Sequence, residues 1–346
     1  MHVKGWKVST IDEILSAILP ESLHDTPPTS FSVVGHIAHL NLRDEYLPFR
    51  FIIGQVLLDK NPNLDLIVNK LQSVETKFRT FPMEVLARRH QDRDPSFIVE
   101  QLESGCRFRF DFSKVYWNSR LHHEHERLVA LFAKGEAIAD VFAGVGPFAV
   151  PAGKKPGVFV LANDLNPDSY QSLVENIKIN KVSKAVKAFN LDGMTFIQNS
   201  ITLLHQAIAT TPTLTINTSS AKRKSRSKDD TNTSPLHNIP IPRFFNHYVM
   251  NLPATAISFL AAFQGLYRPY EQEFSESHAK LPQIHVHAFT KEKTDEAAVQ
   301  DLCTRASEAM GGVLDPSLVH LHWVRNVAPN KASSILSGCR DIGWHD

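Results

Sequence analysis

A short apolar segment that ends on an acid and runs directly into two closely spaced glycines constrains this chain more than any other feature. It reads Asp140-Val-Phe-Ala-Gly-Val-Gly-Pro-Phe148. Gly144 and Gly146 permit a sharp turn and leave no Cβ between the backbone and a ligand. A second apolar run, residues 158–162, is followed by Asp164, about twenty residues past the glycines, where a carboxylate can bind both hydroxyls of a ribose. The order strand, glycine turn, helix, strand and acid predicts a site for a nucleoside-sized methyl donor.

The residues after Asp164 strengthen this prediction, because glycine spacing alone is a weak signal and the third glycine of the dinucleotide fingerprint is missing. Asn166 is a good N-cap and Pro167 suits the first helical position, so a helix should begin there. Its apolar face, which we interpret as core packing, consists of Tyr170, Leu173, Val174 and Ile177.

Apolar runs on both sides of this motif predict the rest of a sheet. Strands are predicted near residues 138–142, 158–163, 186–190, 247–251, 284–289 and 318–325. Helical patterns separate most of them, and a further one over residues 120–134 precedes the first. Residues 116–346 are therefore predicted to form an α/β domain with a doubly wound, largely parallel sheet.

A separate, smaller α/β domain is predicted for residues 1–115. Alternating apolar residues favour a strand over 31–42, a helical pattern covers 47–59, and further β-like runs occupy 67–74 and 108–112. Inside the second domain, residues 210–242 are rich in Thr, Ser, Asn and Pro, which predicts a disordered insertion. Its basic run, residues 222–228, is interpreted as a solvated loop, with RNA contact or an import signal as alternatives.

Composition excludes several classes of protein. Lys plus Arg number 37 against 36 Asp plus Glu, so a nucleic-acid surface has to be local. Three widely spaced cysteines argue against a disulfide framework and a zinc site. The neighbouring residues His122, His123 and His125 point in different directions on a helix, and we expect no metal. No run of about eighteen apolar residues exists, so we expect no membrane association.

A second polar motif follows the run Tyr248-Val-Met250. It reads Asn251-Leu-Pro253, at the carboxyl end of a predicted strand, where ligands bind in such sheets. The amide of Asn251 can hold a ring nitrogen in line with an electrophilic methyl group, and Pro253 stiffens the turn. The motif by itself fits an ordinary strand-to-helix cap equally well.

Together with a run that begins at Cys106 these motifs resemble a known family. The run reads Cys106-Arg-Phe-Arg-Phe-Asp-Phe-Ser-Lys-Val-Tyr-Trp-Asn-Ser-Arg-Leu121, followed by Glu124-His-Glu-Arg-Leu128. From about residue 31 to 331 the chain resembles the eukaryotic and archaeal tRNA (guanine-N1)-methyltransferases that modify guanosine 37, in a fungal-type form. The related aminocarboxypropyl transferases of wybutosine synthesis share the glycine turn and typically lack the Tyr-Trp-Asn-Ser-Arg and Asn-Leu-Pro motifs.

The resemblance implies a class I methyltransferase domain that binds S-adenosylmethionine, preceded by an RNA-binding domain. The residues that it implies for the cofactor are His125, Asp140, Gly144, Gly146, Asp164, Leu165, Asp192, Gly193 and Asn251. Asp164 suits a ribose, and Asp192 follows a predicted strand, where its carboxylate can accept from the adenine amine. A helical histidine near a domain junction is often structural, so His125 stays open between the two roles.

Methylation of guanine N1 requires a base for its proton and a donor that stabilises the charge on O6. Glu124 matches the base of the family, and Arg79 matches its arginine at the base edge. Arg120, four residues before Glu124, is predicted to pair with it on one helical face or to bind phosphate. Substrate contacts are expected from Tyr116, Asn118, Arg120 and Pro253. Tyr116 and Trp117 can stack on an unstacked base, although Trp117 suits the core at least as well.

The two ends depart from the family pattern. We expect part of the amino-terminal module to be missing before Met1, and residues 336–346 lack the alternation of a closing strand. A degenerate cofactor-binding protein and an aminocarboxypropyl transferase are the alternatives to a methyltransferase. We expect a monomer that binds tRNA with guanosine 37, in the cytoplasm, the nucleus or both, with a mitochondrial matrix pool.

Overall fold

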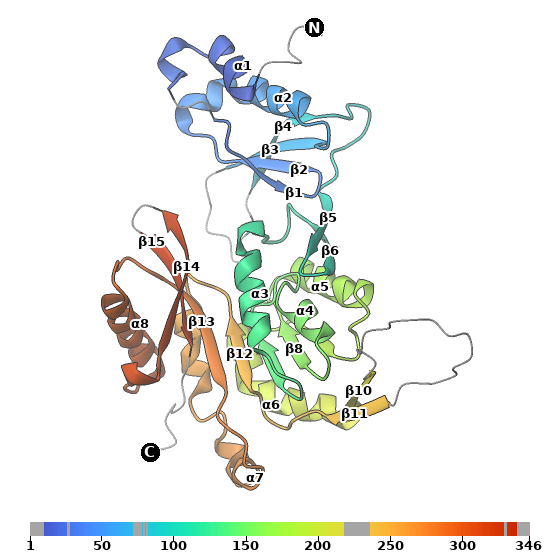
Figure 1. Cartoon of the computed structure of the whole chain (residues 1–346), viewed down its shortest axis with the longest axis vertical. Coiled ribbons are helices and arrows are strands. Elements are labelled where there is room, and N and C mark those ends of the chain that lie inside the picture. Colours follow the sequence, from blue (N-terminus) through green and yellow to red (C-terminus); the bar gives the residue numbers. More distant parts are fainter. Residues whose placement is uncertain are drawn as a thin grey trace, which may run out of the picture. The chain divides into compact units, whose positions relative to one another are not determined.

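The structure is a computed structural model in which the chain forms two compact units (Figure 1). It describes residues 10–25, 28–71, 78, 80, 82–217, 236–328 and 331–337. Unit 1 consists of Met1–Glu103 with Arg107–Ser119, and unit 2 of Ser104–Cys106 with Arg120–Asp346.

Unit 1 contains a four-stranded sheet with helices packed on it. The strands lie in the order β1 (Ser32–Val34), β2 (Ile37–Leu40), β3 (Leu66–Lys70) and β4 (Met83–Arg88). The helices and turns are α1 (Ile11–Ile18), η1 (Glu21–Leu23), η2 (Asp44–Phe49) and α2 (Arg50–Lys60). A Cβ on Gly54 of α2 would lie 2.5 Å from the Cβ of Leu86, so this glycine allows the helix to approach β4 closely. β5 (Ile98–Glu103) and β6 (Cys106–Asp111) form a separate two-stranded sheet.

The single strand predicted over 31–42 is two strands in the structure. Gly35 has a φ of +56° and turns the chain between β1 and β2, which then pair antiparallel. The alternation of apolar residues continues through the turn, so it does not show where one strand ends and the next begins.

Unit 2 contains a seven-stranded sheet in the order β14, β15, β13, β12, β7, β8 and β9. The strands are β7 (Ala137–Asp140), β8 (Phe159–Asn163), β9 (Val186–Phe189), β12 (His247–Met250), β13 (Gln283–Thr290), β14 (His320–Ala328) and β15 (Lys331–Ser337). The five strands from β13 to β9 run parallel. This confirms the predicted doubly wound, largely parallel sheet. The order reverses beside β7, where ligands bind outside the carboxyl ends of the strands.

The expected lack of a closing strand is wrong. β15 lies between β13 and β14 and pairs antiparallel with both. Its residues Lys331–Ser337 begin five residues before the segment 336–346 that lacks alternation, so the two overlap only at residues 336 and 337.

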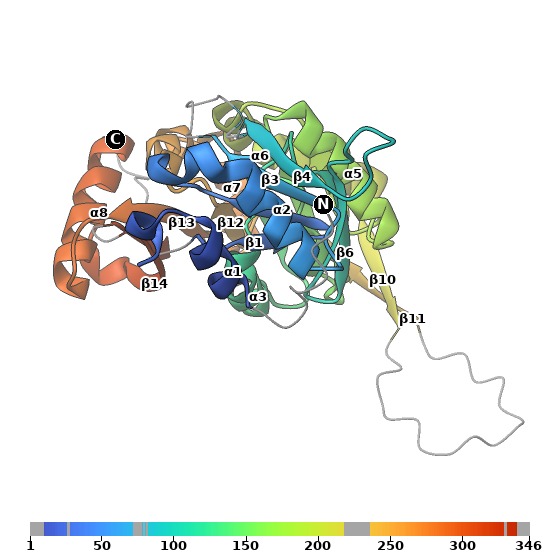
Figure 2. The same cartoon turned by 90° about the horizontal axis from the view of Figure 1, so that it is seen from above.

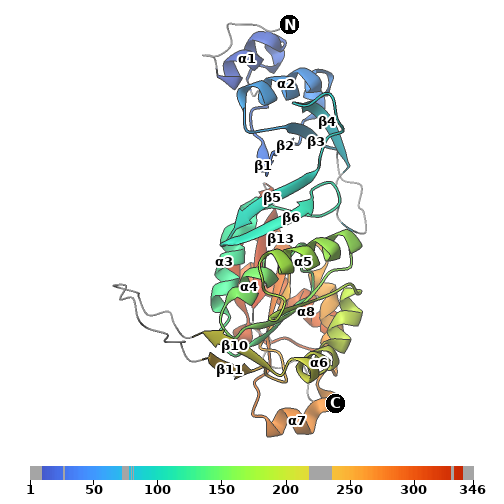
Figure 3. The same cartoon turned by 90° about the vertical axis from the view of Figure 1, so that its right-hand side faces the viewer.

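Helices cover both faces of this sheet. They are α3 (His122–Leu131), α4 (Ala149–Lys154), α5 (Pro167–Ile179), α6 (Gly193–Thr210), α7 (Glu271–Glu276) and α8 (Asp295–Met310), with the shorter turns η3 (Ser119–Leu121), η4 (Ala256–Phe263), η5 (Arg268–Tyr270) and η6 (Pro316–Leu318). The apolar core joins alternate strand residues to α6, η4 and α8. Figure 3 shows α4 and α5 side by side, and Figure 1 shows α8 on the opposite side of unit 2.

The opposite face of the sheet carries polar side chains beneath α3. Successive residues of a strand point to opposite faces, so Asp140, His247, His285 and His287 alternate with the core residues of their strands. All four are buried. Phe132, which directly follows α3, contacts His247 with 5.0 Å between ring centroids. The sheet thus presents buried ionisable groups to one helix.

The predicted disordered insertion over 210–242 is wrong at both ends. β10 (Thr213–Asn217) and β11 (Leu236–Pro240) pair antiparallel and form a two-stranded sheet, on the opposite side of unit 2 from α8 (Figure 2). Thr suits strands as well as loops, so composition does not separate the two here. The basic run 222–228 lies outside the described residues.

Candidate cofactor and base site

The two glycines of the turn after β7 have different roles. Gly144 has a φ of +55°, and a Cβ placed on it would find no atom within 4 Å. Gly146 has a φ of +100°, and its Cβ would lie 2.8 Å from the side chains of Leu173 and Val150. Gly144 therefore exposes bare backbone to open space, whereas Gly146 lets the turn pack against α5 and α4.

Asp140, at the end of β7, has an unusual environment for a carboxylate. It is 1% exposed, and neither carboxylate oxygen has a hydrogen-bond partner among the residues that the structure describes. Burial, with the nearby charge of Asp164, raises the pKa of Asp140 well above its ordinary value. The backbone amides of Ala149 and Phe142 offset part of this rise, although neither has the geometry of a hydrogen bond to it. Such a group is costly unless a ligand supplies donors or positive charge.

Asp164 links the strand after the glycine turn to the turn itself. Its Oδ2 accepts from the backbone amide of Gly144 at 2.8 Å, and Oδ1 accepts from that of Asn166 at 2.9 Å. Burial raises the pKa of Asp164, and these two hydrogen bonds offset part of the rise. Each oxygen keeps acceptor capacity. The half-buried Leu165 follows, held through its carbonyl by the amide of Asn190 at 3.0 Å.

Asp192 and Gly193 begin α6 at the neighbouring strand end. Asp192 is exposed and caps the helix, with Oδ1 accepting from the amide of Met194 at 2.9 Å. A Cβ on Gly193 would lie 2.7 Å from Phe142 and 2.9 Å from Phe259, whose rings meet edge to face. Gly193 therefore makes room for two half-buried aromatic rings at this edge.

Asn251 and Pro253 directly follow β12, as the sequence predicts. Both are half-buried. The carbonyl of Pro253 accepts from the backbone amide of Phe289 at 3.3 Å, which ties this turn to β13. Asn251 thus lies at the carboxyl edge of the sheet, directly after the strand that pairs with β7.

Glu124 lies on the buried side of α3 and is 4% exposed. Arg127 binds it through two nitrogens, Nε to Oε2 at 2.8 Å and Nη2 to Oε1 at 3.0 Å. Nε2 of His287 lies 3.3 Å from Oε1. Burial by itself raises the pKa of Glu124, but the hydrogen bonds and charges of His287 and Arg127 outweigh it and hold the pKa below its ordinary value. Glu124 is therefore an ionised carboxylate at neutral pH.

The predicted pair of Arg120 and Glu124 stays a prediction. Arg120 lies in η3, the turn that directly precedes α3 at His122. The arginine that grips Glu124 is Arg127, three residues after it. Arg120 itself is exposed.

His125 is buried beside the glycine turn. Its ring meets that of Phe148 edge to face, with 4.7 Å between centroids. Its role toward the cofactor stays a prediction, and Arg79 lies outside the described residues.

The aromatic residues predicted to stack on a base belong to unit 1. Tyr116 is 42% exposed, and its hydroxyl oxygen lies 3.4 Å from Nδ2 of Asn118. Trp117 is buried against Phe108 and Phe110, which confirms the core interpretation. Of Tyr116 and Trp117, Tyr116 is thus the residue whose ring is exposed for stacking on a base.

Two buried asparagines that the sequence did not single out hold the site together. Asn163 donates to the carbonyls of Val141 and Leu191 and accepts from the amide of Leu191. Asn176 of α5 donates to the carbonyl of Val145 in the glycine turn at 3.0 Å. The signal for Asn163 was its place between an apolar strand and Asp164, where a buried amide needs partners.

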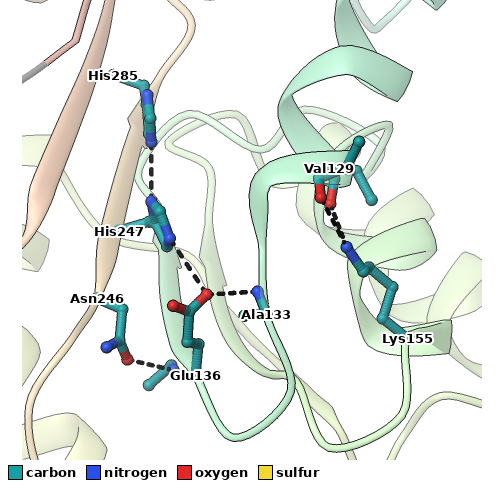
Figure 4. A network of polar contacts seen from close by, with 9 residues as sticks. Val129, Ala133, Glu136, Lys155, Asn246, His247 and His285 are labelled. Carbon is teal, nitrogen blue, oxygen red and sulfur yellow. Dashed lines mark hydrogen bonds and ion pairs between the residues drawn. The ribbon is translucent and has the colours of Figure 1, made fainter.

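A second buried polar network lies along the same face of the sheet. Nδ1 of His247 and Nε2 of His285 are 2.9 Å apart, and Nε2 of His247 lies 3.2 Å from Glu136 Oε2 (Figure 4). Burial lowers the pKa of His285 to about 3, so this ring is neutral. Lys155 donates to the carbonyl of Val129 in α3 at 2.8 Å.

Among the residues that the structure describes, no cluster of three or more His, Cys, Asp or Glu side chains is arranged to hold a metal ion. Within the same residues, no helix combines the length and apolar character that crossing a membrane requires.

Comparison with known proteins agrees with the fold. The TRM5/TYW2 methyltransferase domain matches residues 99–214, and the TYW2 N-terminal domain matches residues 11–88. The tRNA (guanine(37)-N(1))-methyltransferase of Schizosaccharomyces pombe is 51% identical over 327 residues, which are 92% of this chain and 70% of the relative. The enzyme of that name in Saccharomyces cerevisiae is 47% identical over 94% of this chain and 66% of its own length.

Solved structures show the same fold at lower identity. Trm5b from Pyrococcus abyssi has a TM-score of 0.61 and 23% identity over 92% of this chain and 77% of its own. A complex of aTrm5 with tRNALeu has a TM-score of 0.62 and 21% identity over 95% of this chain and 77% of its own. Because 92% of this chain is 51% identical to a relative of which it covers 70%, the chain belongs to the tRNA (guanine(37)-N(1))-methyltransferase family.

Proposed function

We propose that this protein transfers a methyl group from S-adenosylmethionine to N1 of guanosine 37 in tRNA. The observation that carries the proposal is the shared edge of the sheet in unit 2. There, the carboxylate of Asp140, which has no hydrogen-bond partner among the described residues, and the open backbone of Gly144 lie one strand from Asn251. The relatives at 47–51% identity carry the name of this activity.

The residues present fit the cofactor. A buried carboxylate without donors suits the ammonium group of the amino-acid end, since a charged donor would relieve its burial. The remaining acceptor capacity of Asp164 suits two ribose hydroxyls. The residues that we propose to hold the cofactor are His125, Asp140, Gly144, Gly146, Asp164, Leu165, Asp192, Gly193 and Asn251. When bound, S-adenosylmethionine supplies the electrophilic methyl group.

The protein's own residues prepare the nucleophile. We propose that Glu124 takes the N1 proton of guanine, because its carboxylate is ionised and buried. Asn251 holds the base in line, and Arg79 stabilises the charge that moves to O6. We assign Tyr116, Asn118, Arg120 and Pro253 to substrate contacts. Recognition of tRNA by residues 1–115, a monomeric state and a cytoplasmic, nuclear or mitochondrial location belong to the proposal as well.

The test is methyl transfer to unmodified tRNA transcripts that carry guanosine or adenosine at position 37, with nucleoside mass analysis. One-methylguanosine from the guanosine transcript alone supports the proposal. A product heavier by an aminocarboxypropyl group identifies the other transferase. Cofactor binding without transfer identifies a degenerate member of the family.

A further inference from the structure

The contact between Glu124 and His287 connects α3 with the catalytic edge of the sheet. Met250 pairs with Val286 in the parallel register of β12 and β13, so His287 lies level with Asn251. His287 is 1% exposed, and its ring lies 5.8 Å from that of Phe148 in the glycine turn, centroid to centroid. It thus lies between the proposed base and the strand end that carries Asn251.

The hydrogen bonds at Glu124 distinguish its two oxygens. Oε1 accepts from Nη2 of Arg127 at 3.0 Å and from Nε2 of His287 at 3.3 Å. Oε2 accepts from Nε of Arg127 at 2.8 Å. A carboxylate oxygen offers about two lone pairs. Oε1 is therefore saturated, whereas Oε2 keeps one lone pair.

The chemistry of His287 fixes which of its nitrogens carries the hydrogen. An ionised carboxylate only accepts, so Nε2 must be the donor and Nδ1 is bare. Nδ1 is buried and has no hydrogen-bond partner among the described residues. Burial lowers the pKa of His287, and the carboxylate of Glu124 offsets part of that change. The ring is therefore a neutral donor that has no route for passing a proton onward.

We propose that His287 is a positioning residue for Glu124, which saturates Oε1 and leaves Oε2 to accept the N1 proton. This rests on the proposed function. The proton of N1 passes to Oε2 while the N1 electron pair forms the bond to the methyl carbon, and the carbon–sulfur bond breaks with its electrons on sulfur. The proton then leaves Oε2 for solvent.

The charged and titratable groups that face Glu124 come from three elements. Arg127 belongs to α3, and so does His125, which acts on His287. His287 belongs to β13, as does the neutral His285, on which the charge of Glu124 also acts. His322 of β14 is half-exposed, and its Nε2 lies 3.8 Å from Oε2, beyond hydrogen-bonding distance. Loss of the His287 donor removes one of the interactions that favour the ionised form of Glu124. The acid limb of the pH–rate profile should then move to higher pH.

The experiment is single-turnover methyl transfer to a tRNA transcript with guanosine 37, measured across pH. Removing the donor in His287→Leu should lower the plateau rate about ten- to a hundredfold and move the acid limb up by about one pH unit. The amide nitrogen of His287→Gln ends near the position of Nε2, so this variant should restore both to within about threefold of wild type. The amide nitrogen of His287→Asn ends near the position of Nδ1 instead. This variant should therefore not restore the rate or the acid limb, although its side chain is equally polar.

His285→Leu is the matched control, since His285 is a neutral, buried histidine two residues earlier that pairs with His247 (Figure 4). His285→Leu should keep the wild-type pH–rate profile. If His287→Leu and His287→Asn also keep the wild-type profile while Glu124→Gln loses activity, the inference is wrong and the proposed function stands. Full activity of Glu124→Gln would instead show that Glu124 is not the general base of the proposed function.

Discussion

Arg127 holds both carboxylate oxygens of Glu124, at 2.8 Å and 3.0 Å, from the next turn of the same helix. The carboxylate is 4% exposed, while the side chain of Arg127 is 30% exposed. A planar guanidinium matches a carboxylate in this two-pronged geometry better than an ammonium group does. The proposed base is thus fixed in place before any substrate is bound.

We expect Arg127→Ala to lower the free energy of unfolding by about 2 kcal/mol at neutral pH, because it leaves a buried carboxylate with fewer donors. The folded-state pKa of Glu124 is lowered, so this stabilisation exists above the ordinary value of 4.5 and disappears as the pH falls through the folded-state pKa. Urea denaturation across pH measures it. In the double variant with Glu124→Gln the loss should be smaller than the sum of the two single losses.

Glu124→Gln should reduce single-turnover methyl transfer about 10²- to 10⁴-fold, the usual contribution of a general base. Affinity for S-adenosylmethionine should stay within about threefold, because the carboxylate is assigned to the substrate proton. Calorimetric titration and rapid-quench kinetics separate the two effects. A rate that stays high and independent of pH excludes Glu124 as the base.

Asp140→Asn should stabilise the ligand-free protein by about 1 kcal/mol near pH 8, since it removes a buried carboxyl group that has no hydrogen-bond partner among the described residues. The folded-state pKa of Asp140 is raised, so its stabilisation is complete below the ordinary value of 3.8 and is lost as the pH rises through the folded-state pKa. The variant should flatten this pH dependence and bind S-adenosylmethionine at least tenfold more weakly, by about 1.4 kcal/mol. Asp192→Asn, at an exposed helix cap, is the control for stability.

Gly144→Ala and Gly146→Ala should separate ligand access from packing. The Gly146 variant places a methyl group 2.8 Å from Leu173 and Val150 and should lose about 3 kcal/mol of stability. The Gly144 variant meets no atom within 4 Å and should lose about 1 kcal/mol through its left-handed conformation alone. Its main effect should be weaker cofactor binding. Thermal unfolding with and without S-adenosylmethionine distinguishes the two; equal cofactor affinity in wild type and Gly144→Ala would contradict the assignment of that open space.

The positions of the strands in unit 2 could be predicted from the sequence better than their order in the sheet. Apolar runs located β7, β8, β9, β12 and β13 because buried parallel strands are nearly continuous apolar segments. β15 was not predicted, because its position between β13 and β14 depends on pairing that includes a segment distant in the chain. In unit 1 the turn at Gly35 was hidden for a different reason, because the alternation of apolar residues continues through it.

The sequence by itself determined the glycine turn, the acids after the strands and the position of Asn251, because short-range spacing fixes where a strand ends and which residue follows it. Only the tertiary structure decided the environment of Glu124. Its partners Arg127 and His287 come from α3 and from a strand more than one hundred and sixty residues away in the chain. A carboxylate's basicity depends on burial and on the donors around it, and distant segments supply both only after the chain has folded.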